Sequence, residues 1–428
     1  MSYRKYTEYK PSGIDWVSEI PKSWEVLPAF SVVKDVCVKN VDGVEDNVLS
    51  LSYGNIVKRN LDGNAGLLPE SFNTYQIVLE GNIVLRLTDL QNDKKSLRVG
   101  YVTEKGIITS AYLNLACLKH IEPRYAYFLL HSYDLTKVFY GMGGGLRQSM
   151  KFEDLKRLPI IFPPYSEQLS IVQFLDAETA KIDKLICKQS QLIELLKEKR
   201  QSVISKVATI RGDEKALKLS YCVDLLPGYA FPSSGYHFEK ASNIRLLRGV
   251  NVGVDSIRWE DVVYWNVSDK IDLSAFELRE RDIVIGMDRP WIAAGARVAE
   301  INKEDLPCLL LQRVARVRVN NGYYQPFIKM CLSSFEFKAF IESDLTGVSV
   351  PHLSPEQIKS FQIRNINMEQ QKRETDKAVY LCNKLTEIEN KAYEVIKYLT
   401  ERRSALISAA VTGKIDVRKW LPDAKDVA

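Results

Sequence analysis

The stretch Glu198-Lys-Arg-Gln-Ser-Val-Ile-Ser205 recurs late in the chain as Glu401-Arg-Arg-Ser-Ala-Leu-Ile-Ser408, at an offset of 203 residues (401 − 198 = 203). Upstream, Glu167-Gln168 recurs as Glu369-Gln370 at an offset of 202 (369 − 167 = 202), which predicts a one-residue slip between the copies. A match over about fifty residues indicates that one structural unit occurs twice in the fold.

Each copy is predicted to form a long helix. Apolar residues, completed in the first copy by Glu178, Gln189 and Lys199, follow a 4-3-4-3 spacing, which is typical of a coiled-coil seam. Pro163-Pro164 precedes the first helix, and Gly212 and Gly413 follow the two helices as breakers. The predicted helix-pairing residues are Leu175, Ile182, Leu185, Leu192, Leu196 and Val203 in the first copy and Leu381, Leu385, Ile388, Val395, Leu399 and Leu406 in the second.

The shared register and equal length of the two helices favour pairing with each other. Like helices separated by a whole domain pair most simply in antiparallel fashion, about a pseudo-two-fold axis. The alternative is two unrelated amphipathic helices, each buried in the core of its own domain.

The block before each helix contains short β-branched runs between turns and closes with a helical stretch. The predicted fold class is therefore α+β, with two globular mixed α/β domains separated by two long helices that form an antiparallel coiled coil. The predicted limits are 1–164 for the first domain, 165–212 for the first helix, 213–365 for the second domain, 366–414 for the second helix and 415–428 for a C-terminal tail.

The formal net charge of +5 fits a nucleic-acid partner without requiring one. Arginine suits guanine edges and phosphates, and glutamine suits adenine. Any one such side chain alone is more simply a solvated charge, but as a set in duplicated domains they predict contacts with DNA. The candidates beside turns are Arg86, Lys94, Lys95, Arg98 and Arg147 in the first domain and Arg248, Arg289, Arg297, Gln312 and Arg313 in the second.

Catalytic and metal-binding signatures are absent from the sequence. Phe162-Pro-Pro-Tyr165 resembles the loop of amino-methyltransferases, but Phe162 cannot accept the hydrogen bond that an Asn or Asp accepts there. The glycine-rich run at 141–145 lacks the lysine of a phosphate-binding loop. The seven cysteines form no C-x-x-C pair, and the four histidines lack ligand spacing, so each histidine is expected to be structural. The polar N-terminus and the absence of a long apolar run predict a cytoplasmic protein without a membrane segment.

Several stretches, in this order along the chain, resemble the specificity subunit of type I restriction-modification systems. The likeness covers essentially the whole chain, although Ile366-Asn-Met-Glu-Gln370 lacks the two prolines that precede the first helix. The stretches are Lys10-Pro-Ser-Gly-Ile-Asp-Trp-Val-Ser-Glu-Ile-Pro-Lys-Ser-Trp-Glu25, Gly106-Ile-Ile-Thr-Ser-Ala-Tyr112, Leu158-Pro-Ile-Ile-Phe-Pro-Pro-Tyr-Ser-Glu-Gln168 and Arg403-Ser-Ala-Leu-Ile-Ser-Ala-Ala-Val-Thr-Gly-Lys-Ile-Asp416.

The resemblance implies that each domain recognises one half of a bipartite double-stranded DNA target, while the helices set the spacing and dock two modification (methyltransferase) subunits. Restriction (endonuclease and translocase) subunits would then join. S-adenosylmethionine and ATP would bind to those partners, and this chain would be non-catalytic and carry no cofactor or metal. Two other hypotheses stay open. A self-sufficient methyltransferase or nuclease would need a cofactor loop, and a protein-binding coiled-coil scaffold would not need two large basic domains.

Overall fold

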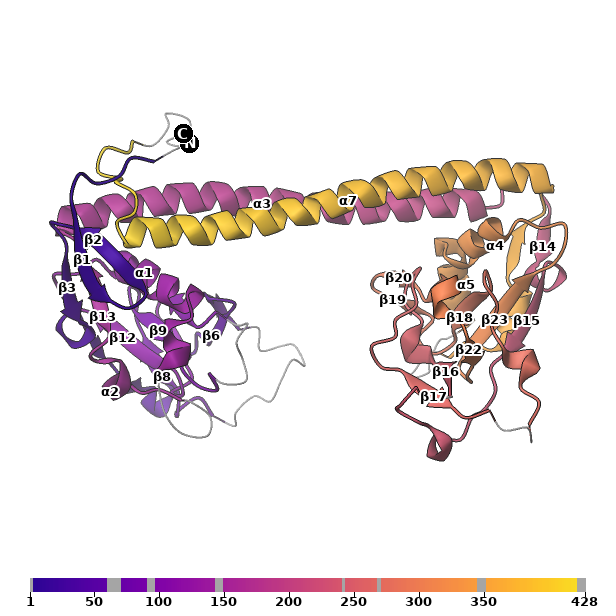
Figure 1. Cartoon of the computed structure of the whole chain (residues 1–428), viewed down its shortest axis with the longest axis horizontal. Helices are drawn as coiled ribbons and strands as arrows, with labels where there is room; N and C mark the ends of the chain where they lie inside the picture. The colour runs from indigo at the N-terminus through magenta and orange to yellow at the C-terminus, as the bar shows by residue number, and fades with distance from the viewer. Residues whose placement is uncertain are drawn as a thin grey trace. The chain divides into compact units, whose positions relative to one another are not determined.

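The computed structural model describes residues 3–59, 71–90, 97–142, 149–240, 243–267, 271–344 and 352–421. The chain forms two compact units, residues 1–189 with 394–428, and residues 190–393 (Figure 1). Each unit holds one globular domain and a part of both long helices, α3 (Tyr165–Ala208) and α7 (Met368–Val411). The predicted α+β class with two long helices is confirmed, and the predicted domain limits stay predictions.

The centre of the first domain is a four-stranded antiparallel sheet in the order β10-β9-β12-β4, accompanied by a three-stranded sheet in the order β11-β8-β5. Helices α1 (Pro123–Leu135) and α2 (Phe152–Leu155) complete this domain. Its strands are β1 (Tyr9–Ile14), β2 (Val17–Pro21), β3 (Glu25–Pro28), β4 (Val33–Asp35), β5 (Val38–Lys39), β6 (Leu49–Ser52), β7 (Asn55–Lys58), β8 (Gln76–Val78), β9 (Ile83–Leu85), β10 (Val99–Tyr101), β11 (Gly106–Ile108), β12 (Leu113–Cys117) and β13 (Pro159–Phe162).

The second domain repeats this central sheet, because its order β21-β18-β23-β15 matches the first strand for strand. Its shorter helices are α4 (Gln325–Leu332), α5 (Phe335–Asp344) and α6 (Pro355–Ser360). Its strands are β14 (Ala216–Lys218), β15 (Val223–Pro227), β16 (Ile244–Leu247), β17 (Val263–Trp265), β18 (Ile283–Gly286), β19 (Trp291–Ile292), β20 (Gly295–Ala296), β21 (Val298–Glu300), β22 (Cys308–Leu310), β23 (Val314–Val319) and β24 (Gln362–Arg364).

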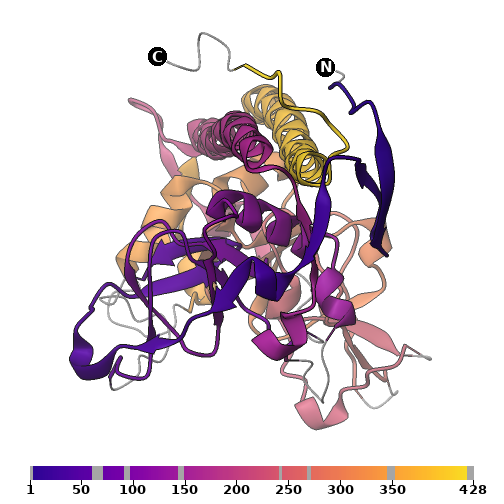
Figure 2. The ribbon, with the colours of Figure 1, turned by 90° about the vertical axis from the view of Figure 1, so that its left-hand side faces the viewer.

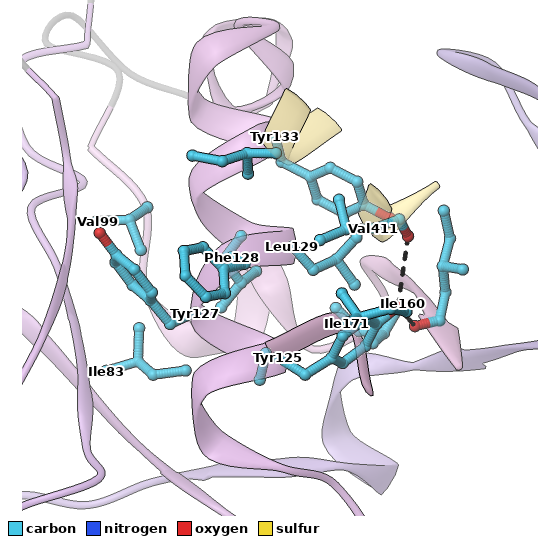
Figure 3. Close-up of a cluster of buried hydrophobic side chains, with 14 of the residues drawn as sticks. Ile83, Val99, Tyr125, Tyr127, Phe128, Leu129, Tyr133, Ile160, Ile171 and Val411 are labelled. Carbon is cyan, nitrogen blue, oxygen red and sulfur yellow. Dashed lines mark hydrogen bonds between the residues drawn. The ribbon is translucent and has the colours of Figure 1, made fainter. Parts of the chain in front are cut away.

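The core of the first unit joins the sheet to the long helices through α1. The Tyr125 hydroxyl donates to the carbonyl of Ile161 at 2.9 Å and to that of Val411 at 3.4 Å, so α1 contacts both β13 and the end of α7 (Figure 3). Ile171 of α3 is buried in the same cluster. In the first unit, α3 and α7 run side by side, and both pack against the core of its domain (Figure 2).

The two helices are antiparallel within each unit. In the first unit, the beginning of α3 shares a core with the end of α7, through Leu175 and Ile182 with Leu399 and Leu406. In the second unit, the last turns of α3 share a core with Ala378, early in α7. The predicted pairing of the helices with each other is therefore correct.

The predicted helix-pairing positions are only partly correct. Every second predicted position faces outward, and the residue that follows it faces the partner helix instead. Leu185 and Leu192 are 48% and 37% exposed, and Leu381, Ile388 and Val395 are 41 to 45% exposed. One residue turns a helix by about 100°, which moves a side chain from the seam to the flank. Of the predicted residues, Leu175, Ile182, Leu196, Leu399 and Leu406 are buried, and Val203 and Leu385 are half-buried; the alternate inward positions are Thr179, Ile186, Ile193, Cys382 and Ile396.

The predicted one-residue slip between the copies is also wrong. The buried Gln168 and Gln371 make equivalent hydrogen bonds, so the offset here is 203 (371 − 168 = 203), as in the later part of the helices. The prolines that are missing before α7 are replaced by Asn367, whose Oδ1 accepts the backbone N–H of Gln370 at 2.9 Å and caps the helix.

Both ends of the described chain meet in the first unit. The carboxylate of Glu167, at the start of α3, accepts hydrogen bonds from the Tyr6 hydroxyl and the Trp24 indole, each at 2.9 Å. Gly413 follows α7 with φ +74°, and a Cβ there would lie 2.3 Å from Cδ of Pro21, so a larger residue would force these segments apart. None of the helices in the described residues is long and apolar enough to cross a membrane.

Candidate nucleic-acid interface

The two domains share a turn that follows the central strand of the sheet. Residues 86–90 follow β9 and residues 287–290 follow β18, and each turn contains one non-glycine residue with a left-handed backbone, Asp89 (φ 55°) and Arg289 (φ 45°). Such conformations cost free energy and are concentrated at functional sites. These turns are therefore the first place to look for DNA contacts.

Two of the predicted DNA-binding residues, Arg98 and Arg297, donate hydrogen bonds to the backbone of these turns. Arg98 is fully buried, and its Nη1 donates to the carbonyls of Arg86 and Thr88 at 3.0 and 2.8 Å. In the second domain, Nη1 of Arg297 donates to the carbonyl of Asp288 at 2.7 Å. The predicted DNA contact of Arg98 is wrong, because a fully buried guanidinium that donates to these carbonyls does not reach the surface. The contact predicted for the half-buried Arg297 stays a prediction.

Further hydrogen bonds hold the Arg297 guanidinium in place. Its Nε donates to the carbonyl of Val252 at 3.0 Å, and its Nη2 donates to the carbonyl of Gly249, so all three nitrogens are occupied.

Arg248 also donates to the backbone of its own domain. Its Nη2 donates to the Asp261 carbonyl at 2.6 Å, and its side chain is only 22% exposed. Arg248 therefore holds a loop, and its predicted DNA contact stays a prediction.

In the first domain, the other predictions stay predictions. Arg86 is half-buried in the turn after β9. Lys94, Lys95 and Arg147 lie outside the described residues. The second domain therefore provides the better-defined candidate surface.

Three segments converge on that surface, and backbone hydrogen bonds join them. The N–H of Met287 donates to the carbonyl of Arg313 at 2.9 Å, and the N–H of Leu353 donates to the carbonyl of Met287 at 2.8 Å. The predicted DNA-binding residues Arg289, Gln312 and Arg313 are all exposed here. The structure thus brings three of the candidates onto neighbouring segments that are joined by backbone hydrogen bonds.

Two polar residues that the sequence did not single out for DNA contacts complete the cluster. Oδ1 of Asp288 lies 3.2 Å from Nη1 of Arg313 and 2.7 Å from Nδ1 of His352. The shorter contact indicates that His352 donates its Nδ1–H to the carboxylate, so the 3.1 Å contact from Arg313 to that nitrogen is not a second hydrogen bond. His352 was predicted to be structural; it lies 64 residues from Asp288, and no local motif connects them.

Positive charge is concentrated around the cluster. Burial lowers the pKa of the Arg297 guanidinium, and the nearby cations Arg258 and Arg289 lower it further, while Asp288 acts in the opposite direction. Crowded guanidinium groups on a surface favour an anionic ligand such as the DNA backbone.

Catalytic geometry is not evident in the described part of the chain. A cleft of about 360 Å³ in the first unit is lined by Arg124, Asp176, Asp183 and Arg403. These charges are already paired, Arg124 with Asp176 and Arg403 with Asp183. Within the described ranges, no group of three or more His, Cys, Asp or Glu side chains could hold a metal ion.

Comparison with known proteins defines the class of this fold. Residues 53–195 match the family described as type I restriction modification DNA specificity domain. The resemblance predicted from the sequence is thereby confirmed.

Two relatives extend the likeness. The chain is 31% identical over 243 residues to the type I restriction enzyme EcoAI specificity subunit of Escherichia coli, a match that covers 54% of this chain and 40% of that protein. It is 25% identical over 420 residues to the MjaVIII specificity subunit of Methanocaldococcus jannaschii, covering 93% of this chain and 94% of that protein.

Solved structures show the same fold. A chain from a structure on complex assembly and conformational transition of the type I R-M system has a TM-score of 0.67 at 14% identity and covers 92% of this chain and 99% of its own length. The HsdS subunit from Thermoanaerobacter tengcongensis has a TM-score of 0.51 at 15% identity, with 92% and 98% covered.

Proposed function

We propose that this chain is the DNA-specificity subunit of a type I restriction-modification complex, and that each of its two domains recognises one half of a bipartite target. The observation that carries the proposal is the duplicated central sheet with its left-handed turn, exposed in the second domain beside Arg289, Gln312 and Arg313. Modification and cleavage, with S-adenosylmethionine and ATP, take place on partner subunits.

The exposed residues of the long helices supply the docking surface for those partners. Leu185, Leu192 and Leu195 of α3 correspond to Ile388, Val395 and Tyr398 of α7, each at an offset of 203 (388 − 185, 395 − 192, 398 − 195). Exposures match closely within each pair: 48 and 45%, 37 and 41%, 62 and 63%. Repeated apolar rows on a surface indicate contact sites. Two equivalent rows fit two copies of one partner, which are the methyltransferase subunits.

The test of the whole proposal is selection of bound sites from a random double-stranded DNA library by the chain assembled with its methyltransferase. A single sequence of two constant halves around a fixed gap is expected. Binding without sequence preference would overturn the proposal and favour a scaffold.

The docking rows are tested by Leu195→Glu and Tyr398→Glu. Each substitution places a charge in one row, so each should reduce the number of methyltransferase subunits that co-purify from two to one, and the double variant should retain none. The exposed Tyr221→Glu, which lies outside both helices, serves as the control. Retention of two subunits by the double variant would exclude these rows as the dock.

A further inference from the structure

We propose, building on the function above, that Arg313 recognises a guanine in the half-site of the second domain and that Asp288 is the positioning residue that aims it. Nη1 of Arg313 is held by Asp288 at 3.2 Å, while Nε and Nη2 make no hydrogen bond within the described residues. The Nε–Nη2 edge carries two parallel donors. Guanine presents two acceptors, O6 and N7, at the matching separation in the major groove.

The backbone of Arg313 is fixed before any ligand arrives. Arg313 has φ 71°, a left-handed conformation that is costly for a side chain of this size. Two hydrogen bonds hold it, from Met287 N–H to the Arg313 carbonyl and from Gln312 N–H to the Tyr229 carbonyl, both 2.9 Å. The side chain remains 55% exposed, so a rigid backbone presents a donor edge that makes no hydrogen bond with the described residues. Rigid presentation reduces the entropy lost on binding.

Asp288 is itself oriented by His352. The carboxylate accepts from Nδ1 of His352 at 2.7 Å, and the two residues form an antiparallel bridge in the backbone. The single carboxylate neutralises part of the charge on Arg313 and restricts the orientation of its guanidinium through Nη1. An arginine without this partner would serve equally well for any phosphate, whereas a restricted orientation favours the flat edge of a base.

The corresponding positions of the first domain lack this arrangement. The β9–β12 pairing of Leu85 with Leu113 matches the β18–β23 pairing of Ile285 with Ala315, so Arg313 corresponds to Ala111 and Asp288 to Thr88. The hydrogen bond from Met150 N–H to the Leu87 carbonyl matches that from Leu353 to Met287, so His352 corresponds to Ser149. All three charged or titratable groups are therefore restricted to the second domain, and the guanine contact belongs to one half-site only.

The experiment compares variants of the chain assembled with its methyltransferase subunits, with bound sites selected from a random DNA library at two salt concentrations. For Arg313→Ala we expect one G·C position in one half-site to become degenerate, with about 10-fold to 100-fold weaker binding to the wild-type target. Arg313→Lys keeps the charge but not the paired donors, so it should lose the same discrimination. Asp288→Asn should relax that same position while the unfolding temperature stays unchanged.

Arg281→Ala is the matched control. Arg281 is also exposed and left-handed (φ 72°), but it lies at the opposite end of β18. It should leave the selected sequence intact. The proposal is overturned if Arg313→Ala keeps the full sequence, relaxes a position other than guanine, or weakens all sequences alike with a smaller salt dependence, since the last result marks a phosphate contact. Failure of the wild-type assembly to select any bipartite sequence would instead overturn the proposed function.

Discussion

Gln168 and Gln371 perform the same task in the two halves of the chain. Each side-chain oxygen accepts the backbone N–H at the start of a domain helix, from Glu122 and Tyr324 respectively, both at 2.8 Å. Each Nε2 donates to a carbonyl just before a long helix, that of Pro163 at 2.9 Å or that of Ile366 at 2.8 Å. One buried amide thus joins each domain to its long helix.

Substituting either glutamine with alanine should destabilise its unit by about 1–3 kcal/mol, because a buried N–H and a buried carbonyl would lose their partner. Urea unfolding of each variant measures the loss. Gln370→Ala is the control, since Gln370 is exposed and is the residue that the sequence comparison had aligned with Gln168. An equal loss in Gln370→Ala would contradict the structural correspondence.

Stability at low pH should depend on Glu214. Hydrogen bonds from the buried Arg364 lower the pKa of this carboxyl to about 2, and its two oxygens lie 2.6 and 2.7 Å from that guanidinium. A lowered pKa contributes stability above the ordinary value near 4.5, and this contribution is lost as the pH falls towards 2.

Glu214→Gln should therefore cost about 1–3 kcal/mol at neutral pH, and the difference from wild type should shrink between pH 4.5 and about 2. Urea midpoints across this range provide the measurement, with the exposed Glu260→Gln as the control. A difference that is constant with pH would show that the ion pair is not its source.

The two domains should act independently on the target. Replacing residues 213–363 with the matching segment of a relative should change one half of the DNA sequence and leave the other half unchanged. Each domain has its own core and its own sheet, which is the basis for this expectation. Sequencing of methylated sites reports the result, and a change in both halves would mean that the domains are coupled.

The chain without partners should transfer no methyl group to DNA and cut none. Phe162 occupies the place of the Asn or Asp that amino-methyltransferases need, and here it ends β13 directly before the prolines that introduce α3. Incubation of the purified chain with labelled methyl donor and DNA measures transfer. Incorporation that persists after removal of every partner subunit would refute the expectation.

The length of the long helices should set the gap between the half-sites. Four added residues rotate a helix by about 400°, a net 40°, and one base pair turns DNA by about 34°. Insertion of four residues near Gln189 in α3 and four near Ala392 in α7 should thus preserve both half-sites and lengthen the gap by about one or two base pairs. Site selection measures the gap. An unchanged gap would mean that the helices dock partners without measuring distance, and altered half-sites would mean that they contribute to base recognition.

The sequence was sufficient to predict the repeat, the two long helices and the resemblance to the family, because each of these produces a periodic or extended pattern of residues. The prediction failed for the seam residues, where a shift of one residue decides which side chains face inward. Leu185 and Leu192 suggested a seam because leucine is apolar, whereas the inward positions include the polar Thr179, whose hydroxyl is satisfied by the carbonyl of Leu175 at 2.6 Å. A second apolar row beside the seam made the two registers indistinguishable by composition.

The candidate site was harder to predict for a different reason. Arg98 and Arg313 both stand beside turns, but one is fully buried and the other is 55% exposed, and no local pattern separates them. Asp288 and His352 meet only because the turn after β18 and the segment before α6 come together in the folded domain. Such contacts depend on tertiary structure, and sequence spacing does not reveal them.

The exposed rows on α3 and α7 also matter for the life of the chain before assembly. Leu195 and Tyr398 leave more than 60% of their side chains in water, and their neighbours leave more than a third. We expect a newly made chain that displays such rows to adhere to other copies of itself or to chaperones. The amount of this chain in the cell would then depend on the amount of its partner. Under the proposed function, a chain without its partner would be removed by aggregation or proteolysis and would not accumulate on the genome.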